Sequence, residues 1–159
     1  MAWLYASQPE DVANCVIHND FRFDNLVLDT GDPTQVVGVL DWEMATLGDP
    51  LMDLGGTLAY WVRDDDYEFF RQFSRPPPHL AGMSSRAEVV GYYCDAMGYT
   101  VAPEQWRFYE VYGLFRLAVI SQQIYYRYFH KQTTNEAYAR FGPAAQYLEK
   151  RGAAIIGPS

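Results

Sequence analysis

His18-Asn19-Asp20-Phe21-Arg22-Phe23-Asp24-Asn25, followed later by Asp41-Trp42-Glu43, is the most informative part of the sequence for predicting the fold. Three short apolar runs surround these segments, and each predicts a β-strand: 15–17, 25–28 and 36–40. Between the last two runs, the turn-forming residues of 29–33 predict a hairpin connection. The polar residues of the quoted stretch therefore fall at the ends of short strands, where side chains from separate segments can meet.

Beyond Trp42 the sequence pattern becomes helical. Capping signals predict helices at about 49–62, 85–98 and 103–130, and a last helical stretch from about 135 that is interrupted at Gly142-Pro143. Residues 111–120 are apolar almost all round, which indicates a buried central helix. The aspartates at 64–66 and the prolines at 76–78 predict a surface connection around an aromatic patch. The fold class expected from these elements is α+β, mainly α.

Composition narrows the classes of function. With 159 residues, of which 49% are hydrophobic, the chain is expected to form a single domain, 1–159. The formal net charge of -8 argues against a nucleic-acid partner and against an anionic membrane surface. Cys15 and Cys94 have no metal-ligand spacing, and no apolar run reaches membrane-spanning length. A cytoplasmic protein is therefore expected.

Acidic residues are concentrated between Asp20 and Asp53. This segment holds eight carboxylates (20, 24, 29, 32, 41, 43, 49 and 53) against a single base, Arg22. Such a stretch favours a divalent cation, although a merely solvated acidic loop would have the same composition.

The spacing H-x-D-x-x-x-x-N places the carboxylate of Asp20 and the amide of Asn25 in one loop. Phosphoryl transfer to a hydroxyl uses a carboxylate that takes the proton of the acceptor, together with oxygen ligands that hold Mg2+ on the nucleotide phosphates. Asp41, at the end of the next predicted strand, adds a second metal ligand. Protein kinases use the same spacing in their catalytic loop. The order of strands, loop, Asp41-Trp42-Glu43 and helix makes a chance match the weaker interpretation.

Residues 1 to about 130 resemble the C-terminal lobe of the aminoglycoside phosphotransferase and choline kinase superfamily, especially the phosphotransferase domains related to those fused to acyl-CoA dehydrogenases. The resemblance rests on three segments in the same order: 18–26, then 39–45 with 48–50 and 53–54, and finally 113–118. It implies the large C-terminal lobe of a protein-kinase-like fold, in which a small β-hairpin region carries the catalytic loop. The catalytic loop and metal site would then span 15–53, and the helical remainder 54–159.

The resemblance also implies roles for individual residues. Asp20 would be the catalytic base, and Asn25 and Asp41 would hold Mg2+ and, through it, ATP. Arg22 would either contact the transferring phosphate or form a surface ion pair.

Further residues are expected to support the site structurally. His18 would pack beneath the loop, Asp53 would accept hydrogen bonds from loop backbone N–H groups, and Asp49 would cap a helix. Glu43 would be either a partner of the metal site or an ion-pair acceptor. Arg116 is predicted to be buried and paired with one of Glu43, Asp49 or Asp53.

Two features depart from the family pattern. Asn19 stands where the family usually has glycine, and Asp24 adds a carboxylate beside the expected metal site. The first fourteen residues contain neither glycine nor lysine, and the lysines are Lys131 and Lys150. The glycine-rich turn and the lysine that grip nucleotide phosphates are therefore expected to be absent, together with the N-terminal lobe.

Two hypotheses of function follow. The first is the catalytic half of an ATP-dependent phosphotransferase acting on a hydroxylated small molecule, truncated and weakly active or inactive by itself. A second copy of the chain or an N-terminal lobe would be its partner, covering exposed apolar surface. The second is a non-catalytic binding or assembly module that retains the lobe fold. A phosphohydrolase is less favoured because such sites recruit histidines, and only His18 is near. A hydroxylated metabolite or a hydroxyacyl derivative is the expected substrate.

Overall fold

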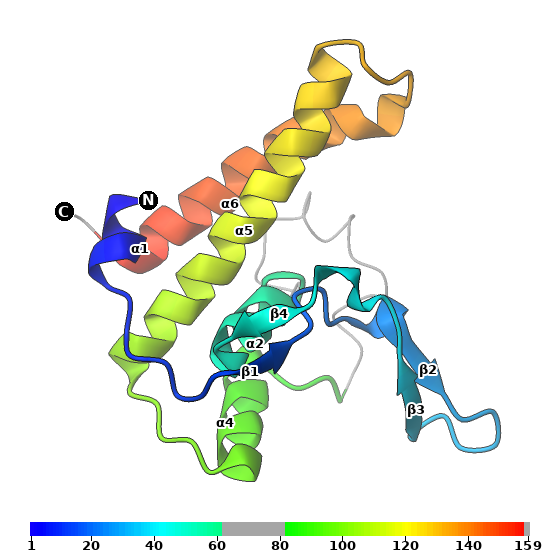
Figure 1. The fold of residues 1–159 in the computed structure, drawn as a ribbon. Helices are drawn as coiled ribbons and strands as arrows, with labels where there is room; N and C mark the ends of the chain where they lie inside the picture. The colour runs from blue at the N-terminus through cyan, green and yellow to red at the C-terminus, as the bar shows by residue number, and fades with distance from the viewer. Residues whose placement is uncertain (62–81, 158–159) are drawn as a thin grey trace.

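The computed structural model describes residues 1–61 and 82–157 (Figure 1). Within these residues lie five α-helices: α1 (Ala2–Ala6), α2 (Pro50–Ala59), α4 (Arg86–Met97), α5 (Pro103–Phe129) and α6 (Phe141–Ile156). The four strands are β1 (Cys15–Ile17), β2 (Leu26–Leu28), β3 (Val36–Val39) and β4 (Thr46–Gly48). Short 3-10 helices are Phe23–Asn25, Trp42–Met44 and Glu136–Arg140. The predicted surface connection at 64–66 and 76–78, with its aromatic patch, lies outside the described residues.

The strands form two separate antiparallel pairs, and this small β region precedes a mainly helical remainder. β2 and β3 make the predicted hairpin, in which Leu26 pairs with Val39, and this ribbon projects away from the helices (Figure 1). The second pair joins β1 to β4, with Cys15 opposite Gly48. The mainly α, α+β class is therefore confirmed.

Strand β4 was missed, because the sequence beyond Trp42 was interpreted as helical. Three residues are too few to show an alternating pattern, and the hydrogen bonds of β4 come from β1, which lies about thirty residues earlier in the chain. A Cβ atom at position 48 would lie 2.8 Å from Ile17 Cδ1, so a larger residue there would require the end of the Ile17 side chain to move. Long-range pairing decided this element.

The helix boundaries follow the capping signals. Asp49 Oδ1 accepts from Leu51 N at 2.8 Å at the start of α2, where Pro50 is the first helical residue. Ser85 and Glu88 form both bonds of a capping box at the start of α4. Gly98 ends that helix in the left-handed region, with φ 71. The predicted interruption of the last helical stretch is present, but it falls before Gly142-Pro143: the 3-10 helix Glu136–Arg140 ends where α6 begins at Phe141. Gly142 and Pro143 lie in the first turn of α6, where a missing N–H costs nothing.

The core lies where α5 packs against α2 and α6. Tyr109 and Leu114 of α5 and Leu148 of α6 are almost completely buried, which confirms the buried central helix. In Figure 1 the helices α5 and α6 lie side by side, and α2 crosses behind the β1–β4 pair. The crossing of α2 and α5 is close, because a Cβ on Gly113 would lie 2.1 Å from the Gly55 carbonyl oxygen. Only glycine fits there, and this close contact fixes the position of α2 along α5.

None of the helices formed by residues 1–61 and 82–157 combines the length and apolar character needed to cross a bilayer.

Candidate active site

Asp53 on helix α2 holds the start of the quoted loop. Its Oδ2 accepts from His18 N at 2.7 Å and its Oδ1 accepts from Asn19 N at 2.8 Å. Hydrogen bonds to an ionised carboxylate are stronger than those between neutral groups. The two bonds therefore fasten the loop to a helix that is itself locked onto α5.

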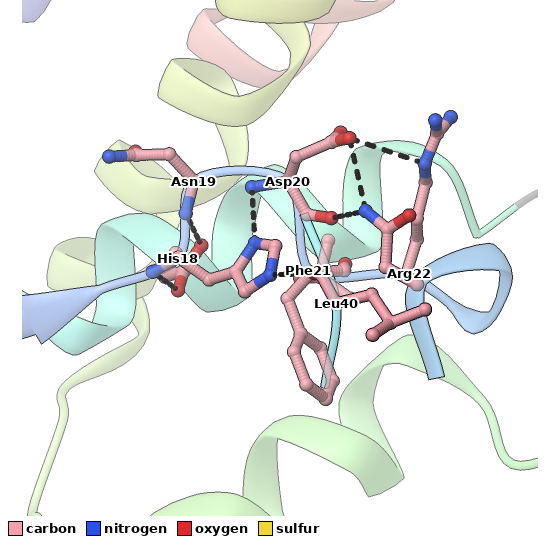
Figure 2. A network of polar contacts seen from close by, with 9 residues as sticks. His18, Asn19, Asp20, Phe21, Arg22 and Leu40 are labelled. Carbon is pink, nitrogen blue, oxygen red and sulfur yellow. Dashed lines mark hydrogen bonds and ion pairs between the residues drawn. The ribbon is translucent and has the colours of Figure 1, made fainter. Parts of the chain in front are cut away.

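The imidazole of His18 supports the loop from beneath. It is 2% exposed, its Nε2 lies 2.8 Å from the Leu40 carbonyl oxygen, and its Nδ1 lies 3.2 Å from Asp20 N (Figure 2). Because a backbone N–H can only donate, Nδ1 accepts and Nε2 carries the proton that is donated to Leu40. The ring also packs against Trp42, with 4.6 Å between centroids. His18 thus links the backbone of Asp20 to the end of strand β3.

Asn25 orients the carboxylate of Asp20. Its Nδ2 donates to the Asp20 carbonyl oxygen at 2.8 Å and to Asp20 Oδ2 at 3.2 Å. Its own carbonyl oxygen accepts from Leu40 N at 2.8 Å, which brings the residue after Leu40, Asp41, to the same end of the hairpin. With both amide hydrogens turned to Asp20, the Asn25 side chain has Oδ1 left as an acceptor. Asp20 and Asn25, predicted to converge, do so.

Arg22 lies beside the same carboxylate. Its buried Nε is 3.4 Å from Asp20 Oδ2, without hydrogen-bond geometry, and its guanidinium lies 5.7 Å from the centroid of the Tyr60 ring. The sequence left open a phosphate contact or an ion pair, and in this structure Arg22 is an ion-pair partner of Asp20. Phe21, between them, is tied to α2 because Thr57 Oγ1 donates to its carbonyl oxygen at 2.8 Å.

Asp41 and Glu43 both follow the end of β3, and both are exposed. Asp41 adopts φ 64, a left-handed conformation that a non-glycine residue rarely takes, at the start of the 3-10 helix Trp42–Met44. Among the residues that the structure describes, no three His, Cys, Asp or Glu side chains gather as a metal site. A metal held by Asn25 and Asp41, one amide and one carboxylate, stays a prediction, as does either role of Glu43.

Asp49 lies in the core rather than at the loop. It is 1% exposed, and its carboxylate accepts from Val12 N at 3.1 Å, from Leu51 N at 2.8 Å and from the Tyr109 hydroxyl at 2.8 Å. Burial first, and then this hydrogen bond, raise the pKa of Tyr109 well above its usual range. Asp49 therefore caps α2 and joins that helix to α5 and to the segment before β1.

Arg116 does not have the carboxylate partner predicted for it. Its Nη1 donates to Asn19 Oδ1 at 3.1 Å, while Asp49 and Asp53 are engaged by the donors described above. Asn19 adopts φ 65, a left-handed conformation that glycine takes freely and that asparagine tolerates. Its side-chain amide accepts the hydrogen bond from Arg116.

A small pocket opens beside Asp20. Its walls come from the loop, from α2 and from α5, and the residues that line it are Asn19, Asp20, Phe21, Gly56, Thr57, Tyr60, Gly113, Arg116, Leu117 and Ile120. Burial raises the pKa of Tyr60, and the negative charge of Asp20 raises it further. The positive charges of Arg22 and Arg116 act in the opposite direction and lower it. Sequence reasoning missed Thr57 and Tyr60, which carry no motif and follow Asp53 by about one and two helical turns.

Comparisons with known proteins agree on one family. The sequence profile described as "Phosphotransferase enzyme family" matches residues 1–89. Acyl-CoA dehydrogenase family member 11 of Mus musculus is 33% identical over 137 residues, which are 84% of this chain and 17% of that protein. Family member 10 of Mus musculus is 35% identical over 127 residues, 79% of this chain and 12% of that protein. The chain thus spans less than a fifth of the length of these relatives.

A solved structure shares the architecture. A crystal structure from Ralstonia eutropha JMP134, of a protein provisionally assigned as an aminoglycoside phosphotransferase, superposes with a TM-score of 0.78 and 26% sequence identity. The match covers 97% of this chain and 46% of that one. The helices and small sheets described above are therefore those of a phosphotransferase fold, and the resemblance to the acyl-CoA dehydrogenase-associated group is confirmed.

Proposed function

This chain belongs to the phosphotransferase enzyme family, and on that premise we propose that it is the catalytic half of an ATP-dependent enzyme that phosphorylates a hydroxyl group of a small molecule. The single observation that carries the proposal is the carboxylate of Asp20. It lines a pocket, is 24% exposed, and is oriented by the Asn25 amide, with Arg22 as its ion-pair partner. Such a carboxylate is accessible to an acceptor and held in one geometry.

Asp20 accepts the proton of the acceptor hydroxyl. As the acceptor oxygen forms its bond to the transferred phosphorus, the bond from phosphorus to the leaving nucleoside diphosphate breaks, and the acceptor O–H bond gives its proton to Asp20. The Asn25 amide on Oδ2 and the His18 ring beneath the Asp20 backbone keep the carboxylate in place. Arg22, beside the same oxygen, offers a positive charge to the phosphoryl group as it transfers.

The donor atoms at the end of the hairpin fit a magnesium ion. Asn25 directs both amide hydrogens to Asp20, which leaves Oδ1 as an oxygen ligand. The backbone of Asn25 also accepts a hydrogen bond from Leu40 N, and Asp41 is the next residue in the chain. Oxygen atoms of this kind are the ligands that Mg2+ prefers. A bound Mg2+ would neutralise charge on the nucleotide phosphates.

Nucleotide binding by this half alone is expected to be weak. The chain corresponds to 46% of the matched crystal structure, and in this kind of catalysis the nucleotide is gripped by both lobes. Full activity would then need residues beyond these 159, supplied by an N-terminal lobe in the same or another chain.

The test uses the natural gene product that carries these residues. With ATP, Mg2+ and a panel of hydroxylated small molecules, we expect release of nucleoside diphosphate that depends on one acceptor class. Asp20→Asn keeps the shape of the side chain and removes the base, so the turnover number should fall about 100- to 10,000-fold. Asp95→Asn, which removes an exposed carboxylate on α4, is the matched control and should leave turnover unchanged.

Two results would contradict the proposal. One is a folded protein that transfers phosphate to none of the acceptors, which would favour the non-catalytic module. The other is an Asp20→Asn variant as active as the Asp95→Asn control. In a calorimetric titration of the 159-residue chain with ATP and Mg2+, tight binding would exclude the module.

A further inference from the structure

The pocket beside Asp20 has a second polar wall that the proposed function does not use. Helix α5 contributes Arg116, whose Nη1 donates to Asn19 of the loop, and the apolar side chains of Leu117 and Ile120, and all of these residues line the pocket. Gly56 and Gly113 also line the pocket, and Gly113 lies where α2 and α5 cross closely. An acceptor held against Asp20 would therefore lie within reach of a fixed positive charge.

The charge of Arg116 is not neutralised by a carboxylate within residues 1–61 and 82–157. Its hydrogen-bond partner there is the neutral amide of Asn19, at 3.1 Å. Asp20, the carboxylate of the pocket, is already paired with Arg22 at 3.4 Å. The neighbouring carboxylate of Asp53 is occupied by two backbone N–H groups. A partly buried guanidinium of this kind can donate charge-assisted hydrogen bonds to an anion.

From this arrangement, and on the basis of the proposed phosphoryl transfer, we infer that the acceptor is a hydroxylated anion whose carboxylate or phosphate group binds Arg116 while its hydroxyl lies at Asp20. Arg116 is then the residue that selects the acceptor by charge. A cationic acceptor is disfavoured, because Arg116 lines the pocket and the pocket carboxylate, Asp20, is already paired with Arg22, although the whole chain carries a formal net charge of -8.

Binding of small probes to the 159-residue chain tests the inference without turnover. The probes are lactate and its neutral amide lactamide, glycerol 3-phosphate and neutral glycerol, and the cation choline. The readout is the shift of the backbone amide signals of Gly56 and Gly113 in two-dimensional NMR. We expect saturable shifts with lactate, with glycerol 3-phosphate or with both, and the stronger of the two identifies the anion as carboxylate or phosphate. Lactamide, glycerol and choline should bind at least about tenfold more weakly.

Variants separate an anion site from a merely structural contact. Arg116→Gln should weaken binding of the anionic probe at least about tenfold, and Arg116→Lys should retain part of it. Arg127→Gln removes an exposed arginine farther along α5 and should change nothing. Asn19→Gly breaks the contact to Arg116 while suiting the left-handed φ, so it should keep the anionic probe bound. If Arg116 served only to hold the loop, Asn19→Gly would behave like Arg116→Gln.

Equal binding of charged and uncharged probes, or an Arg116→Gln variant with unchanged affinity, would overturn the inference. These results are separable from the fate of the proposed function. Charge-selective binding in a natural gene product that transfers no phosphate would support the anion site and reject the reaction. Phosphoryl transfer to neutral or cationic alcohols would support the reaction and reject the anion site.

Discussion

Replacing Asp53 by alanine should release the catalytic loop from helix α2. The carboxylate accepts two backbone hydrogen bonds, from His18 at 2.7 Å and from Asn19 at 2.8 Å. A hydrogen bond to a charged group contributes about 1.5–3 kcal/mol. Asp53 is partly exposed, so the lower end of that range applies to each bond. The free energy of unfolding should therefore fall by about 3 kcal/mol, and by about half as much in Asp53→Asn, which keeps one acceptor oxygen.

Urea denaturation measures the global effect, and amide hydrogen exchange measures the local one. The backbone amides of His18 and Asn19 should exchange about 100-fold faster in Asp53→Ala, because about 3 kcal/mol corresponds to roughly two powers of ten. Thr57→Val is a matched control one turn along the same helix. It removes a neutral hydrogen bond to Phe21 and should cost about 1 kcal/mol while leaving the amides of His18 and Asn19 protected.

Substitutions at unimportant surface positions change the unfolding free energy by no more than about 0.5 kcal/mol. If Asp53→Ala changes it by as little as that, the proposed role of Asp53 is wrong. Unchanged exchange at His18 and Asn19 would lead to the same conclusion. Either result would mean that the loop keeps its shape through its other contacts, such as the His18 ring.

Two further predictions concern the core. Gly113→Ala would place a Cβ 2.1 Å from the Gly55 carbonyl oxygen and should lower the melting temperature sharply, whereas Gly91→Ala, with open space around its Cβ, should raise stability by about 0.5–1 kcal/mol. Tyr109→Phe should cost about 1.5–3 kcal/mol at neutral pH, because Asp49 loses a donor. Burial raises the pKa of Tyr109 above the unfolded value of about 10, so the wild type should lose stability as the pH rises above about 10. Tyr109→Phe lacks the ionisable hydroxyl and should lose less stability over the same change. Urea titrations at neutral pH and above about pH 10 measure the difference.

Local signals in the sequence predicted much of the fold. The helix starts at Asp49-Pro50 and Ser85, the stop at Gly98 and the hairpin between β2 and β3 are all encoded within a few residues. The convergence of Asp20 with Asn25 was also predictable, since both side chains belong to one short loop. Each of these features depends on interactions between near neighbours in the chain, so that composition and spacing are sufficient to indicate them.

Other features of the site depend on contacts between distant segments. The partner of Arg116 was expected to be a carboxylate and is the amide of Asn19, 97 positions away. Tyr60 and Thr57 reach the pocket because their helix is pinned to α5 by glycine contacts. A helical residue of ordinary type gives no signal in the sequence that it faces a catalytic loop.

Matched segments in the sequence were enough to indicate the family, and capping residues were enough to indicate the helix boundaries. The loop that brings Asp20 to Asn25 was also predictable, because its hydrogen bonds join residues five positions apart. The tertiary structure alone decided what surrounds the loop. The crossing of α2 and α5 places Asp53 where it binds the loop backbone, and Arg116 beside Asn19 in the lining of the pocket that Asp20 also lines. The charged side chains of the pocket come together only when the helices pack. Their charge balance therefore cannot be predicted from the spacing of residues in the sequence.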